Sequence, residues 1–162
     1  MDFDIDIDGW PAGVEWDALT VCAHAALGTV EPALHNPRLT ASVLFTSDAD
    51  VHALNKEWRG KDKPTNVLSF PMLEREDLLD LAPEGPPEML GDIALAAGTC
   101  AREAAEKGVP LQTHATHLLI HGLLHLAGHD HVDSDAQAEA MEALEIAALA
   151  KLGIGDPYGD RN

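Results

Sequence analysis

Polar and apolar residues alternate at the start of the chain, where aspartates are interleaved with Phe3, Ile5 and Ile7. This period of two predicts a half-buried strand over residues 2–8, with a row of aspartates on its solvent face that would protect the edge of a sheet. Short apolar runs predict three further strands, at residues 39–46, 66–70 and 91–96.

Apolar residues at helical spacing, with capping residues or glycines at the ends, predict about five helices. They cover residues 14–27, 47–58, 99–107 and 111–127, and a last helix is capped by Asp133 or Ser134 and closed by Gly153. Between residues 72 and 90, three prolines, one glycine and six acidic residues predict a surface loop, with a short helical turn around Leu78.

The order of these elements, with strands concentrated early and helices late, predicts an α+β fold. We expect one domain over residues 1–162, in which a small mixed sheet of about four strands packs against about five helices. The helix at 111–127 is apolar on nearly all sides, so it should lie buried at the centre.

A segment of eleven residues, H-G-L-L-H-L-A-G-H-D-H from His121 to His131, carries the strongest chemical signal. Because His121 and His125 are four residues apart, both imidazoles project from the same face of the helix. Gly128 then ends the helix, since glycine readily adopts the left-handed conformation found just past a helix C-terminus. The chain can therefore turn back and bring a third ligand towards the pair.

Three histidines, namely His117, His129 and His131, are candidates for the third position. His117 would sit about 12 Å from His125 along the helix, too far for both to share one ion with His121. His131 instead reproduces the metzincin spacing H-x-x-x-H-x-x-G-x-x-H. We predict a metal ion bound by His121, His125 and His131, with a fourth position open for water as in catalytic zinc sites. The alternative is a histidine-rich core helix without metal.

Gly122 separates this segment from the zinc peptidases. A zinc peptidase has its general base, a glutamate, directly after the first histidine, and this chain has glycine there. The site therefore looks hydrolytic but lacks the proton acceptor of a protease.

The formal charge of −18 argues against non-specific binding to nucleic acid. Four of the ten cations are nevertheless packed into eight residues, at Lys56, Arg59, Lys61 and Lys63. A guanidinium at Arg59 suits a phosphate or the charge that develops on a phosphorane. Cations at a helix C-terminus, where the helix dipole favours them, are the competing interpretation.

Other features indicate the compartment. The chain has no apolar run of eighteen residues, so we expect no membrane span, and its first residues lack a signal sequence. Cys22 and Cys100 are not in a C-x-x-C spacing, and reduced thiols in the cytoplasm account for them most simply.

The histidine segment, together with N-K-E-W-R-G-K-D-K-P-T-N-V-L-S-F-P at residues 55–71 and L-G-D-I at residues 90–93, resembles the YbeY family of bacterial endoribonucleases. The resemblance runs from the first strand to D-P-Y at residues 156–158. The family's usual pattern has tyrosine where this chain has His129, which leaves the role of His129 open, including that of a fourth or alternative ligand.

The resemblance implies a zinc-dependent, single-strand-specific endoribonuclease with one Zn²⁺ ion per chain. It further implies a role in 3′-end maturation of small-subunit ribosomal RNA and in ribosome quality control. The family's metal-binding histidines correspond to His121, His125 and His131, and its functional arginine corresponds to Arg59. Asp92 and Asp130 are candidates to orient a ligating imidazole, although either suits a turn or a cap equally well.

Two other functions stay open at this point. One is a zincin-type metallopeptidase, and the other is a ribosome-assembly factor with a structural metal, for which His129 would supply a fourth ligand. The acidic composition also suggests that a ribosomal protein contributes positive charge when RNA binds. The sequence leaves the oligomeric state open.

Overall fold

The structure is a computed structural model that describes residues 1–130 and 134–158. Its strands are β1 (Asp2–Ile7), β2 (Leu39–Thr46), β3 (Val67–Pro71) and β4 (Glu88–Ala96). Its helices are α1 (Trp16–Gly28), α2 (Asp48–Arg59), α3 (Arg75–Asp80), α4 (Ala97–Lys107), α5 (Leu111–Leu126) and α6 (Asp135–Lys151), with a 3₁₀ turn η1 (Pro32–His35). The α+β class is confirmed, with one more helix in the described chain than we expected.

The four strands form one mixed sheet in the order β1-β2-β4-β3. β1 and β4 both run parallel to β2, and β3 is antiparallel to β4. β1 is an edge strand, and Asp2, Asp4 and Asp6 are exposed on it as the alternating pattern predicted. Charged side chains on an edge strand discourage pairing with another chain. The opposite edge is β3, which faces the groove described below.

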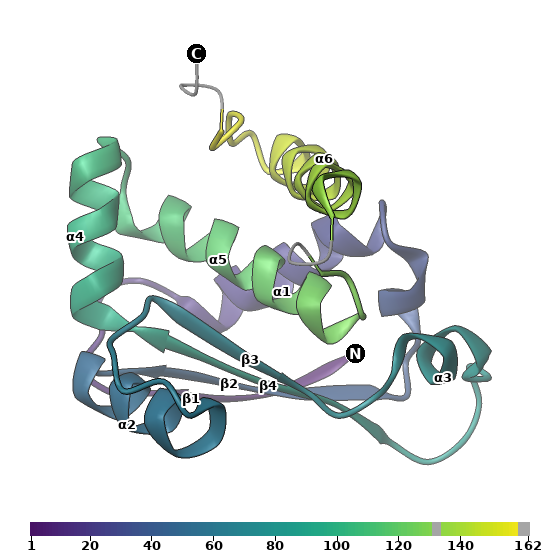
Figure 1. Ribbon diagram of the computed structural model, residues 1–162. Helices are drawn as coiled ribbons and strands as arrows, with labels where there is room; N and C mark the ends of the chain where they lie inside the picture. The colour runs from purple at the N-terminus through teal and green to yellow at the C-terminus, as the bar shows by residue number, and fades with distance from the viewer. Residues whose placement is uncertain (131–133, 159–162) are drawn as a thin grey trace.

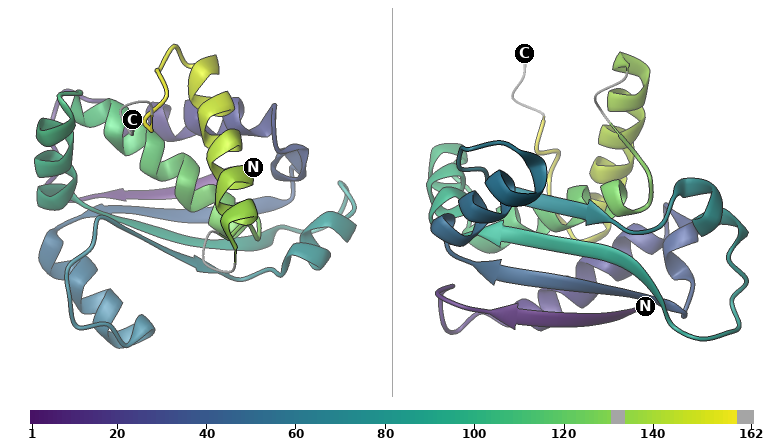
Figure 2. Two further views of the ribbon diagram at one scale, coloured as in Figure 1. Left: turned by 45° about the horizontal axis from the view of Figure 1, so that its top comes forward. Right: turned by 60° about the horizontal axis from the view of Figure 1, so that its bottom comes forward.

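The helices cover the two faces of the sheet unequally. In Figure 1, α5 crosses one face with α1 behind it and α6 beyond, while α2 lies on the opposite face. The views in Figure 2 show the same division. The larger core lies between the sheet and α1, α5 and α6, where Leu119, Ile120, Leu123 and Leu124 of α5 are fully buried. A smaller core around Val51 and Leu68 fills the α2 side. The expected central position of α5 is therefore observed.

The segment between β3 and β4 agrees with the expected loop at its start and differs from it at its end. At its start, α3 is the expected short helical turn, and it buries Leu78 in the main core. At its end, β4 begins at Glu88 rather than at Gly91, because a register shift between Thr40 and Ala41 lets β2 pair further along the chain. The side chain of Arg38 donates to the carbonyls of Ala82 and Pro86 between these two elements.

Helix starts follow the sequence signals closely. The hydroxyl of Ser47 accepts from the amide of Asp50, and that of Ser134 accepts from the amide of Gln137, so Ser134 caps α6. α1 begins two residues later than expected, at Trp16. None of the helices in the described residues is long and apolar enough to cross a membrane.

Candidate metal and RNA-binding groove

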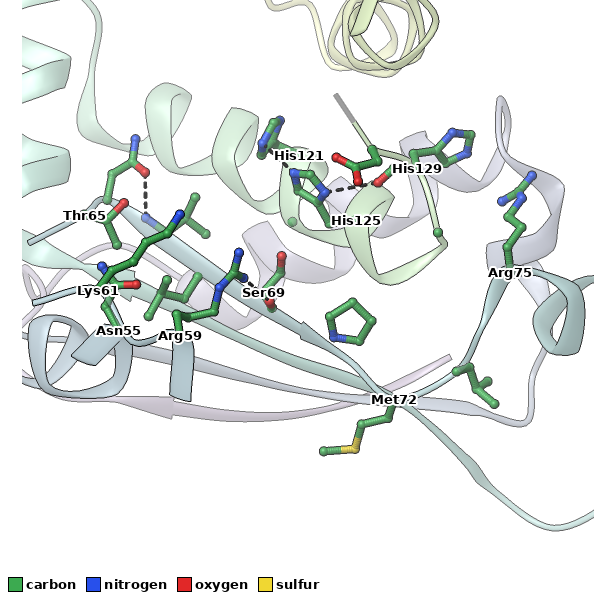
Figure 3. A pocket seen from close by; sticks show the side chains of 18 of the residues that line it. Asn55, Arg59, Lys61, Thr65, Ser69, Met72, Arg75, His121, His125 and His129 are labelled. Atoms are coloured by element: carbon green, nitrogen blue, oxygen red, sulfur yellow. Dashed lines mark hydrogen bonds between the residues drawn. The ribbon is translucent and has the colours of Figure 1, made fainter. Parts of the chain in front are cut away.

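A groove of about 970 Å³ lies between α5 and β3, and it contains both predicted chemical elements. His121 and His125 of α5 line it, and so does Arg59 at the end of α2. Figure 3 shows the two imidazoles on one face of α5, with Arg59 and Lys61 across the groove. The structure thus brings together residues that are more than sixty positions apart in the sequence.

His121 and His125 point their Nε2 atoms at each other across 3.0 Å, because residues four apart lie on the same face of a helix. The other ring nitrogen of each histidine has an acceptor. Nδ1 of His121 is 2.5 Å from Oε1 of Glu145, and Nδ1 of His125 is 3.1 Å from the carbonyl oxygen of His129. Both Nδ1 atoms therefore donate a hydrogen, and each neutral ring keeps its lone pair on Nε2.

Two nitrogen lone pairs that face each other repel unless a proton or a cation lies between them. Two imidazole nitrogens bound to one tetrahedral Zn²⁺ at about 2.0–2.1 Å would be separated by about 3.3 Å, close to the observed spacing. The donor set fits zinc in this respect, and hydrogen-bonded Nδ1 atoms are the usual supports of metal-binding histidines.

The third expected ligand, His131, lies outside the described residues. Within residues 1–130 and 134–158, no three His, Cys, Asp or Glu side chains converge on a point that could hold a metal ion. The described part of the chain therefore provides two of the three expected ligands, His121 and His125.

Glu145 of α6 holds His121 from behind and is fully buried. Burial alone would raise the pKa of this carboxyl, but hydrogen bonds from His117, His121 and Tyr158 outweigh burial and lower the pKa to about 2. The Tyr158 hydroxyl donates to Oε2 across 2.6 Å. A permanently ionised acceptor fixes the His121 ring with Nε2 towards the groove.

The ring of His129 does not join the pair, and Figure 3 shows it directed away from His121 and His125. Its Nε2 lies 2.5 Å from Oε2 of Glu31, which also accepts from Arg75 across 3.2 Å. Burial works to raise the pKa of Glu31, but the His129 hydrogen bond and the Arg75 charge hold it below its ordinary value. This arrangement counts against His129 as a fourth ligand through Nε2.

The basic cluster lies largely in the groove. Arg59, Lys61 and Lys63 line it, whereas Lys56 lies 4.0 Å from Asp62 outside it. Asn55 holds the loop that carries Lys61 and Lys63. Its side chain is buried, and its amide group donates a hydrogen bond to the carbonyl of Lys63. Lys61 and Lys63, which follow the end of α2, are therefore held in the same groove as the histidines. An interaction with the helix dipole alone would not require this position.

Arg59 lies against the free edge of the sheet. Its NH1 donates to the carbonyl of Ser69 on β3 across 3.3 Å, and the side chain is otherwise exposed. A guanidinium has five N–H donors, so this single bond leaves donors that can reach a phosphate in the groove.

Gly122 packs directly against the sheet. A Cβ at this position would lie 3.1 Å from Cδ1 of Ile93, which is a fully enclosed core residue of β4. At the position that carries the general base in zinc peptidases, this chain therefore has a glycine through which α5 packs closely against β4.

Sequence reasoning missed the carboxylates that support the histidines. Asp92 lines a separate cavity of about 550 Å³ with Trp58 and Phe70, and Asp130 lines the groove. The support of His121 is instead Glu145, which comes 24 residues later in the chain. The sequence contained a signal for this residue, because Glu145 lies on the same buried face of α6 as Met141 and Ala148. A glutamate on a buried helix face is rarely without a partner.

The chain is similar over most of its length to proteins of one family. Residues 12–153 match the family described as endoribonuclease YbeY. A protein named endoribonuclease YbeY from Erythrobacter litoralis is 71% identical over 161 residues, 99% of each chain. A protein of the same name from Novosphingobium aromaticivorans is 57% identical, covering 96% of this chain and 94% of the other.

A solved structure supports the fold. The solution structure of a Thermotoga maritima protein superposes with a TM-score of 0.59 at 22% identity, covering 93% of this chain and 91% of that one. The two relatives and the family match over most of the sequence establish the relationship. The chain belongs to the endoribonuclease YbeY family.

Proposed function

We propose that this protein is a metal-dependent endoribonuclease that cleaves single-stranded RNA, with one Zn²⁺ held by His121, His125 and His131. The observation that carries the proposal is the facing pair of Nε2 atoms, 3.0 Å apart, in the same groove as Arg59. Family membership supports the RNA substrate, because the relatives are named endoribonucleases.

The residues of the groove have separate tasks in this proposal. Lys61 and Lys63 bind backbone phosphates next to the scissile bond, and their loop is fixed by Asn55. Arg59 orients the scissile phosphate and stabilises negative charge on its oxygens, because its planar donors match two phosphate oxygens. A zinc ion bound at such a site supplies Lewis acidity and lowers the pKa of a water ligand towards about 7.

The wider role follows from the family resemblance. We propose that the substrate in the cell is the 3′ region of small-subunit ribosomal RNA, cleaved in the cytoplasm during maturation and quality control. A chain with a net charge of −18 repels RNA outside its basic groove. A ribosomal protein would supply additional positive charge in that setting.

The two rival functions have less support. A peptidase needs a general base, and at the position of that glutamate this chain has Gly122, where even a Cβ would lie 3.1 Å from Cδ1 of Ile93. A structural zinc normally has four protein ligands, and the His129 ring, the candidate for the fourth, is bonded to Glu31.

The proposal is tested by cleavage of end-labelled single-stranded RNA, with zinc content measured on the same preparations. Wild type should cut and bind zinc, and His125→Ala should lose both. His52→Ala is the matched control, because His52 lies on α2, does not line the groove and bonds to Asp62 in the loop after the helix. If wild type and His125→Ala cut equally, the activity is a contaminant and the proposal fails. If wild type binds zinc but does not cut, the assembly-factor function replaces it.

A further inference from the structure

We propose that Glu31 is a positioning residue for His125 and acts through His129, an inference that rests on the proposed metal site. Glu31 lies just after α1 and is 98 positions from His129 in the sequence. It is not among the residues that line the groove, and its side chain bonds to His129 and Arg75. Its effect would therefore be indirect.

The first step is the hold that Glu31 has on the His129 ring. The Glu31 side chain is 8% exposed, and its Oε2 lies 2.5 Å from Nε2 of His129. Arg75 of α3 donates NH1 to the same oxygen and, across 2.8 Å, to the carbonyl of Ala127. One buried carboxylate thus joins the end of α1, the start of α3 and the turn after α5. A charge-assisted, largely buried contact of this kind is strong.

The second step is the carbonyl of His129. This oxygen accepts from Nδ1 of His125 across 3.1 Å, so the same residue is bonded through its ring to Glu31 and through its backbone to His125. The backbone between His125 and His129 is short and turns sharply at Gly128, where φ is +94°. The His129 amide also donates to the carbonyl of Leu124. The contact of the ring with Glu31 therefore restrains the residue whose carbonyl accepts from His125.

The third step is the effect on His125. A carbonyl acceptor at Nδ1 selects the tautomer with the hydrogen on Nδ1, which leaves the Nε2 lone pair towards His121. His121 has the carboxylate of Glu145 as a support at Nδ1, whereas the support of His125 at Nδ1 is the backbone carbonyl of His129. The Glu31–His129 contact gives that carbonyl the rigidity that a loop end would otherwise lack.

The chain offers a matched control for the loss of a partly buried ion pair. Asp48 at the start of α2 accepts from the amide of Thr99 across 2.9 Å and from Arg102 across 3.2 Å. Like Glu31, it is a carboxylate with one arginine partner that ties separate elements together. It does not line the groove. Asp48→Ala should therefore lower stability without changing the orientation of His125.

The experiment measures zinc affinity by competition with a chromogenic chelator for wild type, Glu31→Ala, Glu31→Gln and Asp48→Ala. We expect Glu31→Ala to bind zinc about 10- to 100-fold more weakly, the range for lost supports of metal-binding histidines. Glu31→Gln should stay within a few-fold of wild type, because its amide oxygen still accepts from His129. Asp48→Ala should bind zinc as wild type does. Equal affinities for wild type and Glu31→Ala, or equal losses in Glu31→Ala and Asp48→Ala, would overturn the proposal.

A second variant keeps the inference testable if Glu31→Ala does not fold. His129→Ala removes the ring but keeps the backbone carbonyl, so it should weaken zinc binding by a factor similar to that of Glu31→Ala. Where both fold, the double variant should show no further loss, because both changes break the same link. Additive losses in the double variant would show two independent effects and would refute the link.

The metal-free protein separates this inference from the proposed function. Nitrogen-detected NMR of the His125 ring should show a single Nδ1–H tautomer in wild type and a mixture in Glu31→Ala and His129→Ala. If wild type binds no zinc, the proposed function fails while this spectrum still tests the link. If wild type binds zinc but the His125 tautomer is the same in all variants, the link fails and the proposed function stands.

Discussion

Tyr158 donates a hydrogen bond of 2.6 Å to Glu145, so the end of the described chain closes the network behind His121. The other oxygen of Glu145 lies 2.5 Å from Nδ1 of His121. The hydroxyl of Tyr158 also lies 3.1 Å from Nε2 of His117. The segment after α6 therefore contacts the carboxylate that bonds to His121, although it lines a different part of the surface.

Removal of the Glu145 carboxylate should weaken metal binding. We expect Glu145→Ala to reduce zinc affinity about 10- to 100-fold, because the His121 ring loses its acceptor. Tyr158→Phe should have a smaller effect, of about tenfold or less, since one hydrogen bond to a charged group is lost while the carboxylate stays. Chelator competition measures both, and Glu139→Ala on the exposed side of α6 is the control. An unchanged affinity in Glu145→Ala would contradict this role.

Arg59 and Lys56 should differ sharply although both belong to the same basic cluster. Arg59→Ala should lower RNA cleavage about 100- to 1000-fold, as when one donor to a developing oxyanion is removed. Lys56→Ala should change cleavage only a few-fold, because Lys56 lies outside the groove beside Asp62. Zinc content should be unchanged in both variants. Loss of zinc in Arg59→Ala would instead assign that residue a structural part in the metal site.

His114 should make stability depend on pH. It is 4% exposed, and burial lowers its pKa below the ordinary value, although the neighbouring carboxylate of Glu103 works in the opposite direction. The unfolded chain therefore binds more protons than the folded one below about pH 6.5. The stability that neutral His114 contributes is fully present above that pH and is lost as the pH falls through the folded pKa.

Urea unfolding of the metal-free protein between about pH 7 and about pH 5 measures this contribution. His114→Gln keeps a donor for Glu103 but cannot titrate, so its free energy of unfolding should fall less over this range than that of wild type. His24, whose pKa burial also lowers, is unchanged in both proteins and serves as the common background. Equal pH slopes for the two proteins would refute the assignment.

A side chain at Gly122 should be destabilising. Gly122→Ala brings a Cβ to 3.1 Å from Cδ1 of Ile93, so we expect a net loss of about 1–3 kcal/mol in the free energy of unfolding despite the better helix propensity of alanine. Ile93→Val removes that Cδ1 atom. In a double-mutant cycle the two changes should be less destabilising together than their sum. Strict additivity would show that the contact is not the cause.

The fold was largely predictable because its elements carry local signals. The alternating aspartates marked β1 as an edge, and the nearly all-apolar composition of α5 marked it as central. The helical turn expected around Leu78 is confirmed by α3. The start of β4 was not predictable, because it depends on contacts distant in sequence, namely a register shift beside Ala41 and the bonds from Arg38 to the loop before β4.

The same distinction applies to the groove. Helical spacing was enough to pair His121 with His125, and the charge cluster was enough to single out Arg59. The supports of the pair come from elsewhere in the chain, because Glu145 and Glu31 reach it from 24 and 98 positions away. Spacing arguments act over one or two helical turns and therefore could not identify them.

The two cysteines form a natural pair of chemical probes. Cys22 is exposed on α1, whereas Cys100 is fully buried in α4 and burial raises its pKa to about 12. A thiol reagent will therefore label Cys22 in the native protein, at a position outside the groove. Cys100 becomes reactive only when α4 leaves the sheet. A dye can thus be attached at Cys22 for binding measurements without any engineered residue. The slower labelling of Cys100 measures the rate at which the protein unfolds.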